Sequence, residues 1–544
     1  MASTESIYES RLYSTEPKDS LFTGYNAQFS SLGTSLDART ANQIKEVSKH
    51  LNTGLRNVEI AGHDPGVFDS IPKEHFKEIN RLAKLTNAEL SVHAPMVEPT
   101  GIVHGNWSET NRKSAEMQLW NSVERSHELA PEGNIIVNFH ASTDQPQLPS
   151  AEFKTKEGKI EKTEFILYVN PEGKIGQIKN EQKFFPSDKG EISPKFNPVE
   201  LLKTANKEVW DEQLGNMNYY ANQGANIAEN ISRTYDALAS MPPDRKEYQE
   251  TKEKTLKELG RELPHADLYL RNAYRQLKAN FDMVYKDAGD DVRESLNKFR
   301  ERAAEALKEN EFSKAIEDPK KLKEFAGLIE EGINTLRRIE PEKVNILRPL
   351  KDFAIEQSAE TAAEVAFKSY NKFHDSAPII ALENHPAQQS IITTGEELKQ
   401  VVELAREKFI EKAQRNGVSD REAVKQAEKL IGATWDVGHI NMMRKYGYTS
   451  EDIIEQTKAV APFVKHIHLS DNFGFEHTEL PMGMGNVPFK GIMEKIDKAQ
   501  EGFKGKKVIE ALAWWQHFSE QGVNHAIIPT MNGLGAQVSP NYSW

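Results

Sequence analysis

Side chains that bind metals or move protons stand at the ends of several short apolar segments of this 544-residue chain. Six of them each end, or nearly end, one such segment: His93, His140, Glu383, Asp436, His468 and Glu510. Imidazole nitrogens and carboxylate oxygens are the usual ligands of zinc and manganese. Burying a carboxylate without a partner is costly, so six such groups at segment ends favour a metal centre over a structural role.

Further ligand-type residues follow the later segments. His439 stands three residues after Asp436, and His477 and Glu479 stand two apart in HTELPMGMGN. A two-residue spacing in an extended loop places both side chains on the same side. Asn384 is expected to bind the substrate or to support the adjacent ligand. His466, two residues before His468, is interpreted as a core residue or a supporting residue one layer deeper.

The apolar segments alternate with amphipathic helical patterns, which is typical of a parallel sheet. Eight strands are expected at 27–33, 56–61, 88–93, 134–140, 378–384, 431–437, 464–471 and 507–513. Helices are expected at 37–51, 72–86, 108–130, 394–416, 449–461 and 488–500. Eight such units predict a closed (β/α)₈ barrel, whose active site lies at the C-terminal ends of the strands. The six residues are therefore expected on one rim.

A long helix-rich insertion interrupts the barrel between its fourth and fifth strands, at 147–370. It begins with a predicted hairpin of FILYVN and IGQIKN around the turn PEGK. The predicted barrel then comprises 26–146 and 371–518, with polar tails at 1–25 and 519–544. Heptad-like apolar spacing in the insertion predicts packed helices. We expect a lid or an arm through which homo-oligomers form, with a substrate-gripping domain as the alternative.

Composition excludes some classes of site and disfavours some partners. The chain has no cysteine, so a metal site must use His, Asp and Glu. The formal net charge of -13 does not favour a nucleic-acid partner or an anionic membrane surface. No run of apolar residues approaches the roughly 18–20 needed to span a membrane. The polar N-terminus lacks the apolar core of a signal peptide, and the expected location is the cytoplasm.

Seven short stretches carry a family resemblance: HAPM (93–96), NFHAS (138–142), LEN (382–384), WDVGH (435–439), HIHLSDN (466–472), PMGMGN (481–486) and VIEAL (508–512). Together they resemble the signature stretches of the xylose-isomerase-like barrel superfamily. That superfamily includes the endonuclease IV family and many sugar isomerases and epimerases. The resemblance covers roughly 26–145 and 376–515, and does not extend to the insertion.

The endonuclease IV resemblance implies a hydrolase in which three zinc ions cleave the DNA backbone. One zinc would be held by His93, His140 and Glu383, a second by Glu383, Asp436, His468 and Glu510, and a third by His439, His477 and Glu479. The third set departs from the family, where the pair runs Asp then His. Met96 departs too, because the family has an aromatic residue there that probes DNA.

The sugar isomerase and epimerase resemblance implies a single Mn²⁺, Mg²⁺ or Co²⁺ held by Glu383, Asp436, His468 and Glu510. His439 and Asn384 would face the substrate, while the two glutamates move protons next to a carbonyl. The number of ligands favours the multinuclear hydrolase, with two or three zinc ions. The net charge and Met96 favour a small sugar or phosphorylated substrate over nucleic acid. Complete ligand sets disfavour a barrel that binds without turnover. We expect the hydrolase, with the isomerase or epimerase as the alternative.

Overall fold

The computed structural model describes residues 23–535 apart from gaps at 28–30, 53–55, 144–152, 155–159, 162–164, 180–197, 241–245, 311–318, 341–343, 345, 387–390 and 512–522. The chain divides into two compact units. The first comprises Met1–Lys179 and Pro349–Trp544, and the second comprises Asn180–Arg348. Each unit is described by itself.

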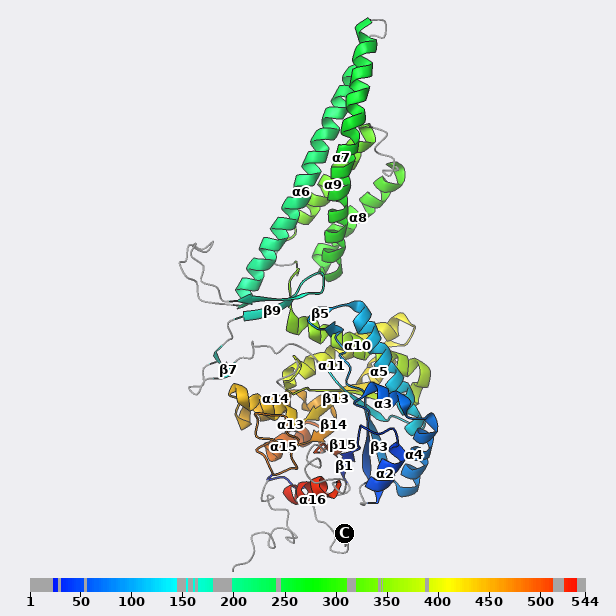
Figure 1. The fold of residues 1–544 in the computed structure, drawn as a ribbon, viewed down its shortest axis with the longest axis vertical. Helices are drawn as coiled ribbons and strands as arrows, with labels where there is room; N and C mark the ends of the chain where they lie inside the picture. The colour runs from blue at the N-terminus through cyan, green and yellow to red at the C-terminus, as the bar shows by residue number, and fades with distance from the viewer. Residues whose placement is uncertain are drawn as a thin grey trace, which may run out of the picture. The chain divides into compact units, whose positions relative to one another are not determined.

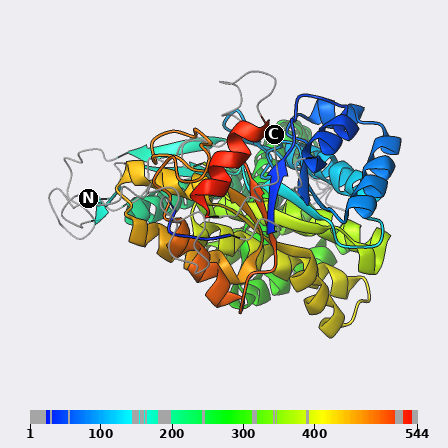
Figure 2. The ribbon, with the colours of Figure 1, turned by 90° about the horizontal axis from the view of Figure 1, so that it is seen from below.

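A closed barrel of eight parallel strands forms the first unit (Figure 1). In barrel order the strands are β1 (Leu32–Ser35), β15 (Lys506–Ile509), β14 (Val464–Leu469), β13 (Ile431–Asp436), β12 (Ile379–Glu383), β6 (Ile136–His140), β3 (Glu89–His93) and β2 (Asn57–Ala61). The predicted (β/α)₈ fold is therefore confirmed. Helices surround the strands, as a second view of the molecule shows (Figure 2).

The helices of this unit follow the strands in turn. They are α2 (Gln43–Leu51), α3 (Pro65–Ser70), α4 (Lys73–Thr86), α5 (Glu109–Ser126), α10 (Leu350–Phe373), α11 (Gly395–Arg415), α12 (Asp420–Leu430), α13 (Val437–Asn441), α14 (Ser450–Val460), α15 (Phe489–Ala499) and α16 (Val523–Gly533). Side chains cap several of them. Thr394 forms a full capping box with Glu397 at the start of α11, and Thr449 forms one with Asp452 at the start of α14.

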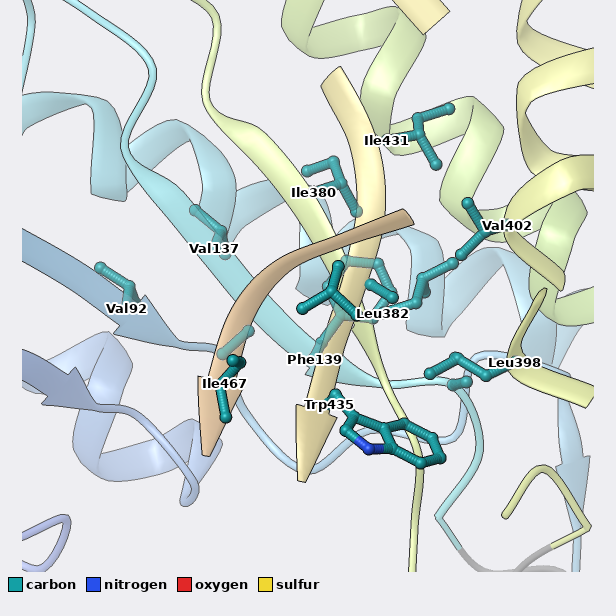
Figure 3. Close-up of a cluster of buried hydrophobic side chains, with 14 of the residues drawn as sticks. Val92, Val137, Phe139, Ile380, Leu382, Leu398, Val402, Ile431, Trp435 and Ile467 are labelled. Atoms are coloured by element: carbon teal, nitrogen blue, oxygen red, sulfur yellow. The ribbon is translucent and has the colours of Figure 1, made fainter. Parts of the chain in front are cut away.

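The outward side chains of the strands form the main core of this unit. Val137 and Phe139 on β6, and Ile380 and Leu382 on β12, are apolar and buried. They belong to one buried cluster with Leu398 and other residues of α11 (Figure 3). Side chains alternate along a strand, so the residues between these apolar ones point into the barrel. Those inward residues are largely polar, and the functional site is built from them.

Short strands add to the barrel unit. They are β4 (Ile102–Val103), β5 (Asn106–Trp107), β7 (Phe153–Lys154), β8 (Ile160–Glu161), β9 (Phe165–Val169), β10 (Ile175–Lys179) and, at the boundary between the units, β11 (Arg348–Pro349). β9 and β10 form the predicted antiparallel hairpin, with Ile175 opposite Val169.

The first barrel strand lies later in the chain than the predicted 27–33. β1 begins at Leu32, where the backbone pairs with Lys507 on one side, and Gly33 pairs with Asn57 on the other. Part of the predicted range, 28–30, lies outside the described residues. Gly33 is required at its position, because a Cβ there would lie 2.6 Å from the Asn57 Cβ.

The second unit contains α6 (Pro198–Ala239), α7 (Lys246–Asp287), α8 (Asp290–Asn310) and α9 (Pro319–Arg337). This unit covers fewer residues than the insertion predicted at 147–370. The hairpin and α10 group with the barrel, because α10 packs against α5 and α11 and buries 14 of its residues. No helix among the described residues is long and apolar enough to cross a membrane.

Candidate metal centre

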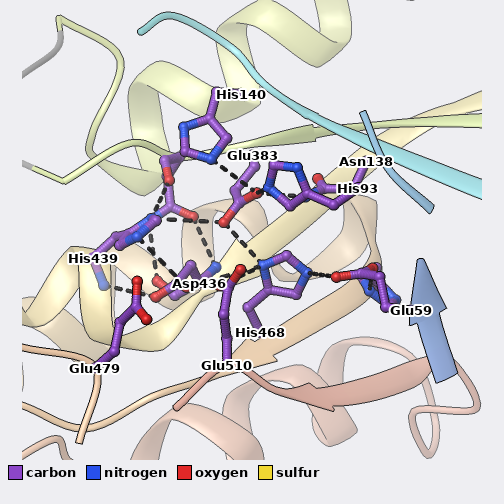
Figure 4. Close-up of polar contacts among 12 residues, drawn as sticks. Glu59, His93, Asn138, His140, Glu383, Asp436, His439, His468, Glu479 and Glu510 are labelled. Atoms are coloured by element: carbon purple, nitrogen blue, oxygen red, sulfur yellow. Dashed lines mark hydrogen bonds and ion pairs between the residues drawn. The ribbon is translucent and has the colours of Figure 1, made fainter. Parts of the chain in front are cut away.

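Four consecutive barrel strands bring four ligand-type side chains together at their C-terminal ends. Glu383 ends β12, Asp436 ends β13, His468 lies near the end of β14, and Glu510 follows β15. His468 Nδ1 lies 3.0 Å from Glu383 Oε1 and 3.0 Å from Glu510 Oε2, and 4.0 Å from Asp436 Oδ2 (Figure 4). All four side chains are buried. We call these four residues the four-residue cluster.

Both nitrogens of the His468 ring face carboxylates. Nε2 lies 3.1 Å from Glu59 Oε1, and Nδ1 donates a hydrogen bond to Glu383 Oε1 at 3.0 Å. Without metal, a proton on Nδ1 therefore occupies the place that a cation would take. Imidazole ligands of metals are oriented by outer partners such as Glu59.

A second group shares Glu383 with the first. The Oε2 atom of Glu383 lies 3.4 Å from His93 Nε2 and 3.5 Å from His140 Nε2. Asn138 Nδ2 donates a hydrogen bond to the same oxygen. His93 Nδ1 lies 2.8 Å from Ala94 O and donates to it, which leaves Nε2 to face Glu383. Glu383 thus directs one oxygen to each group.

The donor set of the four-residue cluster fits a divalent cation. Three carboxylates and one imidazole lie within 4.8 Å of one another, atom to atom, and all are buried. Asp436 Oδ2 is buried and accepts no hydrogen bond from the described residues. Several buried negative charges without compensation would be strongly destabilising. Oxygen and nitrogen ligands of this number suit zinc, manganese, magnesium or cobalt.

Burial and charge shift the pKa values of the site in opposite directions. Burial, together with the nearby Glu510 and Glu383 charges, holds the pKa of Asp436 well above its usual range. Burial alone would lower the pKa of His468, yet the charges of Glu510, Glu383 and Glu59 hold it well above 6.5. The pKa of His439 falls to about 3, chiefly through burial. Without metal the cluster therefore retains protons that a cation would displace.

The residues expected to hold a third ion approach one another only in part. His439 Nε2 lies 2.8 Å from His477 Nε2 and 3.7 Å from Asp436 Oδ2. His477 Nε2 lies 3.6 Å from Glu479 Oε1, and both of these side chains are partly exposed. Among the described residues, however, His439, His477 and Glu479 do not gather within the distance that unites the other groups.

The loop after β14 carries His477 and Glu479 and is held by one carboxylate. Asp471 Oδ2 accepts hydrogen bonds from Gly483 N at 2.8 Å and Gly485 N at 2.9 Å. Its Oδ1 accepts from Val487 N at 3.1 Å and from the backbone of the next residue. Gly485 permits this approach, because a Cβ there would lie 2.3 Å from Asp471 Oδ1. The loop is thereby fixed beside the site.

The sequence match agrees with this geometry. Residues 318–517 match the family model described as xylose isomerase-like TIM barrel. The chain is therefore similar to this family over the segment that holds β12, β13, β14 and β15.

Other similarities of the chain are weaker. The uncharacterized protein MJ1311 of Methanocaldococcus jannaschii is 32% identical over 82 residues, which cover 15% of this chain and 26% of that protein. Two solved structures are a D-tagatose 3-epimerase-like protein and D-psicose 3-epimerase from Clostridium cellulolyticum H10. They are 12% and 10% identical, with TM-scores of 0.38 and 0.37, over 92% and 93% of this chain and 98% and 96% of theirs.

The six strand-end residues singled out from the sequence meet at one rim of the barrel. Asn384 also lies there, where its side chain bonds the backbone of Asp436 rather than facing open space. His466 lies one layer deeper, as expected, and bonds Glu59 at 2.9 Å.

Three site residues were missed in the sequence. Glu59 stands in the middle of an apolar strand, and that position was itself a usable signal. His63, just after β2, stacks on His93 with ring centroids 4.1 Å apart and lies 3.9 Å from Glu510. His385 packs edge-on against His140, with ring centroids 4.6 Å apart.

Proposed function

We propose that the protein is a divalent-metal isomerase or epimerase that acts on a small sugar or sugar phosphate. The observation that supports this best is the four-residue cluster, which supplies a complete ligand set for one ion from Glu383, Asp436, His468 and Glu510. Such an ion, when bound, would polarise a substrate carbonyl. Mn²⁺, Mg²⁺ or Co²⁺ would suit this donor set.

Two glutamates of the cluster are placed to move protons. Glu383 directs Oε1 to His468 and Oε2 away from it, towards His93 and His140. Glu510 directs Oε2 to His468, while its Oε1 faces His63. Each carboxylate therefore keeps one oxygen on the side away from the shared imidazole. We propose that these two groups remove and return the proton on the carbon next to the carbonyl.

Burial and charge support a small substrate. The exposed fraction of each of the four cluster residues is 9% or less. The net charge of -13 does not favour the polyanionic backbone of DNA. Met96, on the loop after β3, is 39% exposed where the nuclease resemblance requires an aromatic probe. His439 is proposed to orient the substrate from beside the cluster, and Asn384 to hold the backbone of Asp436 in place.

A second candidate function rests on one observation. His93 and His140 flank Glu383 Oε2, so Glu383 is placed to bridge two ions. Two or three zinc ions would then favour phosphodiester hydrolysis, because adjacent ions stabilise both the attacking and the leaving oxygen. This hydrolase was the first expectation from the sequence. His439, His477 and Glu479 approach one another only in part, so they give the hydrolase weaker support than the four-residue cluster gives the isomerase.

The two functions predict different outcomes for a proton bound to a substrate carbon: the isomerase exchanges it with solvent, and the hydrolase does not. Metal-loaded protein is incubated in D₂O with a panel of ketoses, aldoses and their phosphates, and the sugars are analysed by NMR and mass spectrometry. The proposal predicts deuterium at the carbon next to the carbonyl, together with a new isomer or epimer. Release of product from a phosphodiester or from abasic DNA, without deuterium uptake into any sugar, would favour the hydrolase.

His140→Ala provides the matching variant test. The isomerase requires only the four-residue cluster, so this variant should keep one bound ion and most of its activity. The hydrolase requires His140 as a ligand, so both metal content and activity should fall sharply. His127→Ala serves as the control, because His127 bonds Ser376 and stacks on Phe373 away from the centre.

A further inference from the structure

A buried carboxylate lies one layer below the proposed metal centre, and neither proposed mechanism uses it. Glu59 is in the middle of β2 and is fully buried. Barrel interiors are ordinarily filled with branched apolar side chains, so a glutamate there needs a specific reason. Its contacts give that reason.

Each oxygen of Glu59 lies next to a histidine nitrogen of the same strand, β14. Oε1 lies 3.1 Å from His468 Nε2, and Oε2 lies 2.9 Å from His466 Nε2. Ser91 Oγ on the neighbouring strand β3 donates to Oε2 at 3.1 Å. His466, His468 and Ser91 are all buried. His466 and Ser91 therefore fix one side of the carboxylate. Its other oxygen faces the His468 ring (Figure 4).

Glu59, His466 and His468 lie close enough together to be considered a second metal site. However, Glu59 Oε2 already accepts hydrogen bonds from His466 Nε2 at 2.9 Å and from Ser91 Oγ at 3.1 Å. We therefore interpret Glu59 as a hydrogen-bond acceptor that supports the proposed centre.

We propose that Glu59 is a positioning residue that sets the tautomer and orientation of His468 and so raises the affinity of the cluster for its metal. This inference rests on the proposed metal centre. Because its carboxylate lies 3.1 Å from Nε2, Glu59 would favour the tautomer with the proton on Nε2 and the lone pair on Nδ1, which faces Glu383 and Glu510. Its negative charge makes the imidazole a stronger ligand. Loss of such an outer partner typically weakens metal affinity by about 10- to 100-fold.

Glu59→Gln removes the charge with little change of shape. The amide oxygen can still face His468 Nε2, and the amide NH₂ can donate to His466 Nε2 when that ring takes its other tautomer. We expect Co²⁺, titrated against a chelating dye, to bind this variant about 10- to 100-fold more weakly than the wild-type protein. The Co²⁺ absorption spectrum should also change, because His468 becomes a weaker ligand. A purely structural role would lower the melting temperature of the metal-free protein and leave both readouts unchanged.

Glu89→Gln is the matched control. Glu89 lies at the start of β3, pairs in register with Asn57 of β2, and has a 67% exposed side chain. The same chemical change there should leave Co²⁺ affinity unaltered.

The outcomes separate this inference from the function on which it rests. Equal Co²⁺ affinity and spectra for Glu59→Gln and the wild-type protein would overturn the role of Glu59 alone. Failure of the wild-type protein to bind Co²⁺ would overturn the metal centre, and the inference with it. If Glu59→Gln does not fold, Ser91→Ala decides the matter, because it keeps the charge but removes one hydrogen bond that orients it. A several-fold weaker affinity would support the proposal, and an unchanged one would contradict it.

Discussion

The meeting of buried imidazoles and carboxylates is the strongest residue-scale evidence for a metal. His93 Nδ1 bonds Ala94 O and His468 Nε2 lies beside Glu59, while the other nitrogen of each ring faces Glu383. Burial alone would lower the pKa of both rings, but the nearby carboxylates raise it, so protons occupy the place that a cation would take. Glu383 is the residue on which both groups depend.

Glu383→Gln should therefore abolish turnover. Glutamine keeps the size of the side chain but cannot ligate as an anion or take up a proton. The loss of activity should be at least about 100-fold, because the metal and its carboxylates supply most of the charge stabilisation. Steady-state rates and metal content measured on the same preparation check this. Near-normal turnover would mean that Glu383 neither binds metal nor moves protons.

Metal affinity should rise with pH. In the metal-free protein the pKa values of His468 and Asp436 are held above their usual range, so these groups retain protons that the cation must displace. Binding then releases protons, and affinity falls as pH falls from 8 to 6. Calorimetric titrations in buffers of different ionisation enthalpy measure the release directly. Binding with no proton release over this range would contradict the assigned geometry.

Residue types at strand ends made much of the site predictable. His140 and Asp436 were identified because a ligand-type side chain stands where an apolar run stops. Glu59 was not, because a single sequence does not show which residues of distant strands share a layer inside the barrel. His63 and His385 lie in loops, and their approach to His93 and His140 depends on how those loops fold back over the rim.

At the scale of elements, alternate side chains along each barrel strand have two different roles. Outward residues such as Phe139 and Trp435 pack in the core between strands and helices, while inward residues such as His140 and Asp436 form the site. The alternation of strands and helices along the sequence predicted all eight strands. It did not predict that α10 belongs to the barrel, because the sequence of α10 continues the helical pattern of the insertion. Only its packing against α5 and α11 assigns it to the barrel.

The loop after β14 should depend on Asp471. In Asp471→Asn one oxygen becomes an NH₂ group that faces two backbone N–H donors, from either Gly483 and Gly485 or Val487 and Asn472. We expect a loss of about 2 kcal/mol in the free energy of unfolding, because hydrogen bonds to a buried charge are lost. Activity should fall too, since the loop carries His477. Urea denaturation and rate measurements check both.

Asp452→Asn is a suitable control for that variant. Asp452 caps α14 through Thr449 at the exposed start of the helix, away from this loop. If Asp471→Asn proved no less stable and no less active than this control, the loop would be held by other contacts.

At the scale of the whole molecule, the division into two units predicts which deletion is tolerated. Replacing Asn180–Arg348 by a short flexible linker should leave the barrel folded, because long insertions add little to the cost of closing a loop. Deleting 147–376 should not, because it removes α10 with its buried side chains. Circular dichroism and thermal melting distinguish the two. An unfolded first variant would show that the barrel needs the helical unit. The formation of homo-oligomers through the helical unit stays a prediction.

The number of tightly bound ions per chain tests the central claim most directly. Chelator-treated protein is dialysed against Mn²⁺, Co²⁺ or Zn²⁺, and metal is counted by elemental analysis in the wild-type protein, His140→Ala and Asp436→Asn. The account predicts one tight ion in the wild-type protein, kept in His140→Ala and lost in Asp436→Asn. Two or three ions, reduced by His140→Ala, would contradict the isomerase in favour of the hydrolase. No bound ion in the wild-type protein would contradict the metal centre itself.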